Sequence, residues 1–428
     1  MAVTTVRPRA AADLDELAYT GPGTLAGRYL RRFWQPVYHA FDLPAGHAKP
    51  LRIMSEDYTL YRGEDGEPHV VAPRCAHRGT QLSTGWVEGD CLRCFYHGWK
   101  YDASGQCVEM PAEDPSFPPK VRIASYPTRE YLGLIWAYLG EGATRDTTSV
   151  AAPSFPRYPE FEDFDGVIEI DSYVRRCNYF QNLENSLDMS HVGFVHSDNV
   201  ASFAGIGSGE TLHAAEGDWG VVYTATRANG EIRINQFGMP NIFHMNALPT
   251  DPEIGWQESL FWWVPVDDET HVQFSLHRLP ITGETARRIC ARRQERRARI
   301  ALAHQEVCEQ VLAGTLRLRD VDLSRVDLVR VQDDIAQVGQ GRIADRAAER
   351  LGRGDLGVIF LRKIWARELR ALAAGRPLKQ WTRPPGLAPT AWTLPGRTAV
   401  ESGGTNLRAR PGTPQLVDVR PAVEVAQL

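Results

Sequence analysis

The chain of 428 residues lacks long apolar runs and has little excess of either charge. No stretch of 18 apolar residues is present, so the sequence predicts no membrane-spanning helix. The first twenty residues lack the apolar core of a secretory signal, and we therefore expect a cytoplasmic protein. The 48 Lys and Arg against 53 Asp and Glu give a formal net charge of -5, which argues against a dedicated nucleic-acid-binding protein.

Cysteine is also scarce, with seven residues in the whole chain. An odd number spread over so long a chain is unlike the disulfide framework of a small secreted domain. In a reducing compartment such thiols stay available as metal ligands. Cys91 and Cys94 form a Cys-x-x-Cys pair typical of thioredoxin-like redox sites, but Cys94 belongs to a stronger motif described below, so we interpret Cys91 as a small buried residue.

The order of elements predicts an α+β protein with four segments. Short β-like runs separated by Gly, Asp and Pro turns fill residues 50–140 and predict a small all-β domain. Prolines at 153, 156 and 159 mark a linker. Strands are expected at 166–175, 257–264 and 271–277, and helices at 180–195, 284–314, 325–350 and 355–374. The predicted segments are an N-terminal segment (1–45), the all-β domain (46–150), a second domain (160–376) and a Pro/Gly-rich tail (377–428) that is either an extended arm or disordered.

Within the all-β domain, two Cys/His pairs have the spacing of metal ligands. Cys75-x-His77 is followed after sixteen residues by Cys94-x-x-His97. One interpretation is a structural zinc ion bound by all four side chains. The other is a 2Fe–2S cluster with both cysteines on one iron and both histidines on the other, which is easier to reduce than an all-cysteine cluster. The surrounding sequences, CAHRG and CFYHGW, resemble the motifs of the Rieske family and favour the cluster.

A second constellation follows in the next domain, with the pattern Asn-x-x-Asp-x-x-His-x4-His. If this stretch is helical, Asn185, Asp188 and His191 share one face, and His196 follows where the helix should end. Two histidines and one carboxylate around a single iron form the facial triad of oxygen-activating non-haem enzymes. Two ordinary, satisfied histidines on a helix are the alternative interpretation. The cluster motif upstream favours the iron site.

Taken together, these motifs resemble the oxygenase (alpha) subunit of Rieske non-haem iron aromatic ring-hydroxylating oxygenases. The resemblance covers about residues 20–375 and is closest to the phthalate-dioxygenase-like and O-demethylase branch. It includes GPGT before RRFWQPV near the start and GRIADRAAERLG near the end. It implies a Rieske domain followed by a helix-grip catalytic domain with an antiparallel sheet. It further implies a homotrimer, because electrons pass between the two metal centres of neighbouring subunits.

The resemblance also assigns roles to single residues. It implies that Cys75, His77, Cys94 and His97 hold the 2Fe–2S cluster. It implies that His191 and His196 bind a mononuclear Fe(II), that Asp188 links the two centres, and that Asn185 is a polar residue near the iron.

A third iron ligand is expected well downstream, in the segment VQDDIAQVGQG (331–341). The family pattern of Gln-Asp followed by Gln-Gly selects Asp333. Helical periodicity favours its neighbour, since Asp334 lies closer to the apolar stripe of the predicted helix. The opposite face also holds apolar residues, so the helix could be buried on both sides, and we keep Asp333.

The expected function is an O2-dependent oxygenase supplied with electrons by a separate NAD(P)H-dependent reductase, with or without a ferredoxin. The expected substrate is an aromatic acid or a methoxyarene that is hydroxylated or O-demethylated. Alternatives are a ring-dihydroxylating dioxygenase of an aromatic carboxylate and, from another class, a simple Rieske electron carrier. Aromatic and Met side chains on the later strands indicate either an apolar substrate wall or ordinary core packing: Phe237, Phe243, Met245, Trp256, Phe261 and Trp263. Asn241 and Asn246 are either polar partners of the substrate or turn residues.

Overall fold

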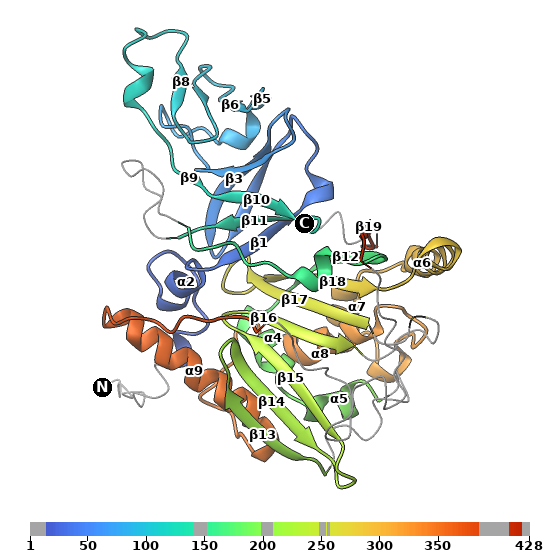
Figure 1. The fold of residues 1–428 in the computed structure, drawn as a ribbon. Coiled ribbons are helices and arrows are strands. Elements are labelled where there is room, and N and C mark those ends of the chain that lie inside the picture. The colour runs from blue at the N-terminus through green and yellow to red at the C-terminus, as the bar shows by residue number, and fades with distance from the viewer. Residues whose placement is uncertain are drawn as a thin grey trace. The chain divides into compact units, whose positions relative to one another are not determined.

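The computed structural model describes residues 14–140, 152–197, 209–247, 254, 257–384 and 411–421. The chain divides into two compact units (Figure 1). One unit is Thr20–Tyr158, and the other combines Met1–Tyr19 with Pro159–Leu428. The boundaries of the four segments expected from the sequence remain predictions.

The Thr20–Tyr158 unit is built from three small antiparallel sheets, as the all-β prediction requires. Its short helix α2 (Leu25–Leu30) starts at Thr24, whose hydroxyl accepts a hydrogen bond from Gly27 N. The three sheets have the strand orders β1-β11-β10, β2-β3-β4-β9 and β5-β6-β7-β8. Their strands are β1 (Trp34–His39), β2 (Ala48–Ile53), β3 (Glu56–Arg62), β4 (Pro68–Val71), β5 (Trp86–Glu88), β6 (Cys91–Arg93), β7 (Lys100–Tyr101), β8 (Cys107–Glu109), β9 (Ser125–Tyr126), β10 (Thr128–Tyr131) and β11 (Leu134–Tyr138).

The other unit is an eight-stranded sheet with helices packed against it. The strand order is β13-β14-β15-β16-β17-β18-β12-β19. Neighbours from β13 to β18, and the pair β18 and β12, run antiparallel, so most of the sheet is a meander. The strands are β12 (Val167–Arg175), β13 (Thr211–Glu216), β14 (Gly220–Thr226), β15 (Ile232–Gly238), β16 (Ile242–Ala247), β17 (Gln257–Pro265), β18 (His271–Leu279) and β19 (Gln415–Asp418).

Helices bring the candidate site residues to this sheet. The helix α4 contacts β17, α9 contacts β13 and β14, and α8 contacts α4, α5 and α7 (Figure 1). None of the helices in the described residues is both long and apolar enough to cross a membrane. The helices are α3 (Pro159–Glu162), α4 (Tyr179–Ser186), α5 (Ser190–Val195), α6 (Gly283–Ala298), α7 (His304–Leu312), α8 (Leu328–Val338) and α9 (Leu356–Ala373).

The strands predicted at 166–175, 257–264 and 271–277 are confirmed as β12, β17 and β18, and the helix at 355–374 is confirmed as α9. The single helix predicted at 284–314 is wrong, because the chain breaks between α6 and α7. Glu306 accepts a hydrogen bond from Ala303 N and so starts α7 anew. The break turns His304 into the protein interior, where it is fully buried. The helix predicted at 325–350 is shorter than expected and ends before Gly339.

The predicted extended tail also contributes to the sheet. Within it, β19 pairs in parallel with β12, and Val167 lies opposite Gln415. The tail therefore supplies an edge strand that its Pro and Gly content did not indicate.

Candidate metal centres and substrate cavity

The two Cys/His loops of the Thr20–Tyr158 unit have the same backbone pattern. In each loop the cysteine carbonyl accepts a hydrogen bond from the glycine four residues later: Gly79 N to Cys75 O, and Gly98 N to Cys94 O, both at 3.0 Å. Both glycines have a left-handed backbone, with φ of 75° and 76°, which a residue with a Cβ atom rarely adopts. Two matched tight loops therefore present the four predicted ligands.

The side chains on these loops form a thiol pair and an imidazole pair. Cys75 and Cys94 are buried, at 3% and 2% exposure, and belong to the core of the unit. The rings of His77 and His97 lie at the surface with their centroids 4.4 Å apart. The indole of Trp99 stacks on the His77 ring at 4.6 Å. A buried pair of sulfur donors beside an exposed pair of nitrogen donors suits a cluster that has two cysteines on one iron and two histidines on the other.

Tyr101 adds a hydrogen bond to this site. Its hydroxyl lies 3.1 Å from Cys75 Sγ and accepts a hydrogen bond from Ala76 N at 3.1 Å. Burial raises the pKa of the Cys75 thiol, although the Tyr101 hydroxyl favours the thiolate. A buried thiol of this kind becomes a thiolate when a metal supplies the compensating positive charge.

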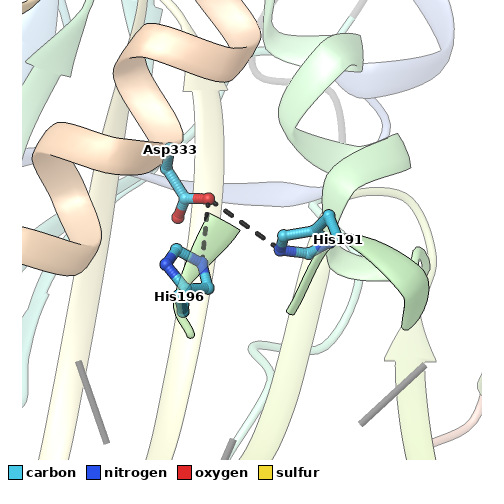
Figure 2. Close-up of side chains that lie close together, drawn as sticks. All are labelled: His191, His196 and Asp333. Carbon is cyan, nitrogen blue, oxygen red and sulfur yellow. Dashed lines mark ion pairs between the residues drawn. The ribbon is translucent and has the colours of Figure 1, made fainter. Parts of the chain in front are cut away.

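The second candidate centre combines His191, His196 and Asp333. His191 lies on α5, His196 directly follows it, and Asp333 lies on α8. Figure 2 shows the Asp333 carboxylate turned toward both imidazoles. Asp333 Oδ1 is 3.4 Å from His196 Nε2 and 3.9 Å from His191 Nε2. One donor atom from each of the three residues lies within 4.8 Å of the other two, close enough for one metal ion.

Neighbouring side chains orient both imidazoles. Nδ1 of His196 lies 2.9 Å from the Gln332 side-chain oxygen, and Nδ1 of His191 lies 3.6 Å from Asp188 Oδ2. The hydrogen bond of His196 Nδ1 leaves its Nε2 on the side of Asp333, whereas the contact of His191 with Asp188 is longer than a hydrogen bond. This donor set of two imidazoles and one carboxylate suits a non-haem iron.

The charges of this group are coupled. Burial would raise the pKa of Asp333, but the hydrogen bond and positive charge of His196 outweigh it and lower the pKa to about 2. Burial would lower the pKa of His196, and the Asp333 carboxylate instead raises it. Metal ligands must be deprotonated, so a divalent cation bound here would take the place of the His196 proton.

The adjacent Asp334 points elsewhere and belongs to a different ion pair. Its carboxylate accepts a hydrogen bond from Arg175 Nε at 2.5 Å and also contacts His304 Nδ1. All three side chains are almost fully buried. Asp334 is thus occupied by a cation, while Asp333 faces the two histidines.

The predicted single helix carrying Asn185, Asp188 and His191 is wrong. The helix α4 ends at Ser186 and α5 starts at Ser190, so Asp188 lies in the turn between them. Asp188 Oδ1 accepts a hydrogen bond from Ser190 N at 2.8 Å, which favours a new helix start there. Asn185 and Asp188 nevertheless both lie near the site. Asn185 Nδ2 donates to Asp333 Oδ1 at 3.2 Å.

A cavity of about 330 Å³ opens beside the three candidate ligands. Four of the predicted apolar residues line it: Phe243, Met245, Phe261 and Trp263. Phe237 is instead fully buried, and Asn241 donates its side-chain amide to Trp263 O, so neither lines the cavity. Trp256 and the Asn246 side chain lie outside the described residues.

Two residues of this region were not predicted. Gln332 precedes Asp333 and could have been suspected from that position alone. Arg233 lines the cavity from β15, where it takes a buried position in an alternating pattern. A charged Arg at a buried position of an alternating strand was the signal in the sequence that could have identified it.

Comparison with known proteins agrees with this geometry. The Rieske [2Fe-2S] domain family matches residues 33–127. The 5,5'-dehydrodivanillate O-demethylase oxygenase subunit of Sphingobium sp. strain SYK-6 is 31% identical over 400 residues, covering 87% of this chain and 83% of that protein. The phthalate 4,5-dioxygenase oxygenase subunit of Pseudomonas putida is 27% identical over 380 residues, covering 82% and 83%. The terminal oxygenase of carbazole 1,9a-dioxygenase from Novosphingobium sp. KA1 shares the fold, with a TM-score of 0.59 at 18% identity, over 88% of this chain and 99% of that chain.

The fold and the two metal centres define an oxidoreductase that uses O2. The chain belongs to the Rieske non-haem iron oxygenases, as an oxygenase subunit. Its cofactors are accordingly a Rieske 2Fe–2S cluster and a mononuclear iron.

Proposed function

We propose that this protein hydroxylates or O-demethylates an aromatic substrate with O2 and electrons from a separate reductase. The observation that carries the proposal is the position of His191, His196 and Asp333 at the wall of a cavity of about 330 Å³. Aromatic side chains form part of that wall, which suits an aromatic ring. The relatives support it, since they include an O-demethylase and dioxygenases of benzoates and phthalate.

In this proposal each centre has its own residues. Cys75, His77, Cys94 and His97 would hold the cluster, while His191, His196 and Asp333 would hold the iron. Three protein ligands leave coordination positions open. Iron bound there supplies the activation of O2 that hydroxylation requires.

Other residues of the chain orient the ligands and the substrate. Asn185 donates a hydrogen bond to Asp333 and holds its carboxylate in place. Asp188 lies against His191 Nδ1, and we assign it the coupling between the two centres. Phe261 and Trp263 stack with ring planes 8° apart, and we expect them to orient the substrate ring and exclude water.

The partner surface of the cluster is an exposed aromatic rim. Phe95 and Tyr96, next to His97, are 53% and 51% exposed. One solved relative is a complex of an oxygenase with its ferredoxin, which supports a separate electron-transfer partner here. We further propose an NAD(P)H-dependent reductase as the electron source, and a cytoplasmic location, where the cysteines, none of which forms a disulfide, stay reduced.

The proposed assembly is a homotrimer in which the cluster of one subunit serves the iron of the next. Co-expression of differently tagged Cys94→Ser and Asp333→Ala chains tests it. Each variant alone should be inactive. Doubly purified mixed trimers should regain part of the turnover, because one chain keeps its cluster and its neighbour keeps its iron. Inactive mixed trimers would contradict transfer between subunits.

Iron counting and product analysis test the function itself. The purified protein should contain about three irons per chain, against about two for an electron carrier and none for a zinc protein. With a reductase and a panel of methoxyarenes and aromatic acids, O2 uptake should depend on the substrate. Formaldehyde identifies O-demethylation, and a new hydroxyl or a cis-diol identifies ring hydroxylation. Absence of O2 uptake with every member of the panel contradicts the proposal.

A further inference from the structure

Arg233 is a buried arginine that lines the cavity. It lies on β15, opposite Ala225 of β14, and its side chain is only 5% exposed. On the same strand Asn235 and Phe237 are also buried, so Arg233 occupies the inward side of the strand. Its guanidinium is therefore withdrawn from bulk water beside the proposed substrate space.

This guanidinium is not neutralised within the described part of the chain. Its Nε lies 3.4 Å from Asn235 Oδ1, a weak contact, and its buried Nη1 has no hydrogen-bond partner among the described residues. Burial and the charge of Arg227 lower its pKa to about 10, so it remains cationic at neutral pH. A buried, unpaired charge is costly to the fold, which favours a role in binding.

Two other arginines of the same unit show how this chain normally compensates a buried guanidinium. Arg175 donates to Asp334 and to the side-chain oxygens of Asn182 and Gln337. Arg330, which also lines the cavity, pairs with Asp171 at 2.5 Å. Arg233 has no ion pair of this kind in the described chain, and its partner must come from elsewhere.

The dimensions of the cavity indicate the size of that partner. Phe261 and Trp263 lie on β17, two strands from β15 in the sheet order. Neighbouring strands are about 4.8 Å apart, so about 10 Å separates the aromatic wall from the strand of Arg233. A substituted benzene ring against that wall can therefore extend an anionic group to the guanidinium. A planar guanidinium matches the two oxygens of a carboxylate.

We propose that Arg233 binds the carboxylate of an aromatic acid substrate and selects anionic over neutral rings. This inference rests on the proposed function, because it assumes that the cavity is the substrate site. It names the residue that distinguishes an aromatic acid from a neutral methoxyarene.

Binding measured without reductant tests the proposal independently of turnover. Calorimetry compares 3-methoxybenzoate with 3-methoxybenzamide, which has the same shape but no charge, on wild-type holoprotein and on Arg233→Gln. The wild type should prefer the benzoate. The substitution should weaken benzoate binding by about 30-fold or more and change amide binding by less than about threefold, since it removes one side of a buried charge pair. Equal affinities in the wild type, or unchanged benzoate affinity in the variant, overturn the proposal.

Stability without ligand separates a binding role from a structural one. Arg233→Gln should be at least as resistant to heat as the wild type, because it removes an uncompensated charge. Arg175→Gln is the matched control and should be less stable, because it removes the guanidinium that pairs with the buried Asp334 carboxylate. A loss for Arg233→Gln as large as that of the control overturns the proposal. A wild type that binds 3-methoxybenzoate through Arg233 but consumes no O2 would contradict the proposed function alone.

Discussion

The side-chain oxygen of Gln332 lies 2.9 Å from Nδ1 of His196, whose Nε2 faces Asp333. A carbonyl oxygen can only accept, so Nδ1 carries a hydrogen, and Nε2 is the nitrogen left to bind a metal once its own proton is displaced. The residue directly before the candidate ligand Asp333 thus sets the tautomer of another candidate ligand. Gln332 and Asp333 both lie on α8, which positions them.

Gln332→Leu should therefore lower the affinity for ferrous iron by about 10–100-fold, the usual effect of losing an outer hydrogen bond to a ligand histidine. Competition with a coloured chelator measures the affinity of the metal-free protein. Gln340→Leu, at an exposed position just beyond the same helix, is the control and should bind iron as the wild type does. Equal affinities for Gln332→Leu and the control would contradict the tautomer argument.

The neighbours Asp333 and Asp334 should fail in opposite ways when replaced by Asn. Asp333→Asn should lose the mononuclear iron and keep its fold. Asp334→Asn should lose about 3–5 kcal/mol of stability, because it leaves Arg175 charged and buried without its partner. Iron content and urea unfolding of both variants distinguish the two. A stable Asp334→Asn protein that lacks only the mononuclear iron would instead make Asp334 the ligand.

The sequence alone identified the candidate residues whose positions depend on short-range spacing. Both Cys/His loops need only a few consecutive residues, and their motifs placed all four cluster candidates. The choice between Asp333 and Asp334 depends on Arg175, which is 159 residues away from Asp334 along the chain. Periodicity could not include that ion pair, and it favoured the aspartate that binds the arginine.

The helix around Asp188 shows a second limit. Three residues at helical spacing indicate one face, but the Asp188 side chain bonds to Ser190 N and divides the stretch in two. His191 and His196 nevertheless lie beside Asp333, because the chain turns back toward α8 after the break. For Arg233 the sequence offers only its place in an alternating pattern, since the missing partner is a property of the folded sheet.

His271 should make the protein sensitive to mild acid. Burial and the charge of Arg175 lower its pKa to about 3, below the ordinary value of about 6.5. Between these values His271 binds a proton in the unfolded chain but not in the folded chain. The contribution of His271 to stability is thus fully present above pH 6.5 and is lost as the pH falls, by about 1.4 kcal/mol per pH unit.

Urea unfolding between pH 7.5 and 5.0 measures this slope. His271→Gln should lose stability less steeply than the wild type as the pH falls, because it removes the proton-binding group. His213→Gln, at an exposed position of the same unit, should keep the wild-type slope. Parallel curves for His271→Gln and the wild type would show that His271 is not the group responsible.

Tyr101 should tune the reduction potential of the cluster. Ala76 N donates to the Tyr101 hydroxyl, which leaves the hydroxyl hydrogen free to donate to Cys75 Sγ. Such a bond stabilises the reduced cluster, which carries more negative charge on sulfur. Tyr101→Phe should therefore lower the potential by about 20–60 mV, the equivalent of one net hydrogen bond in a one-electron couple.

Voltammetry of the purified protein measures this potential, and the visible spectrum checks that the cluster is retained. Tyr61→Phe is the matched control, because the buried Tyr61 hydroxyl donates to Asp90 O and makes no hydrogen bond to a cluster cysteine. Its potential should remain at the wild-type value. A potential that rises in Tyr101→Phe, or that falls equally in both variants, would mean that the hydroxyl does not act through the Cys75 sulfur.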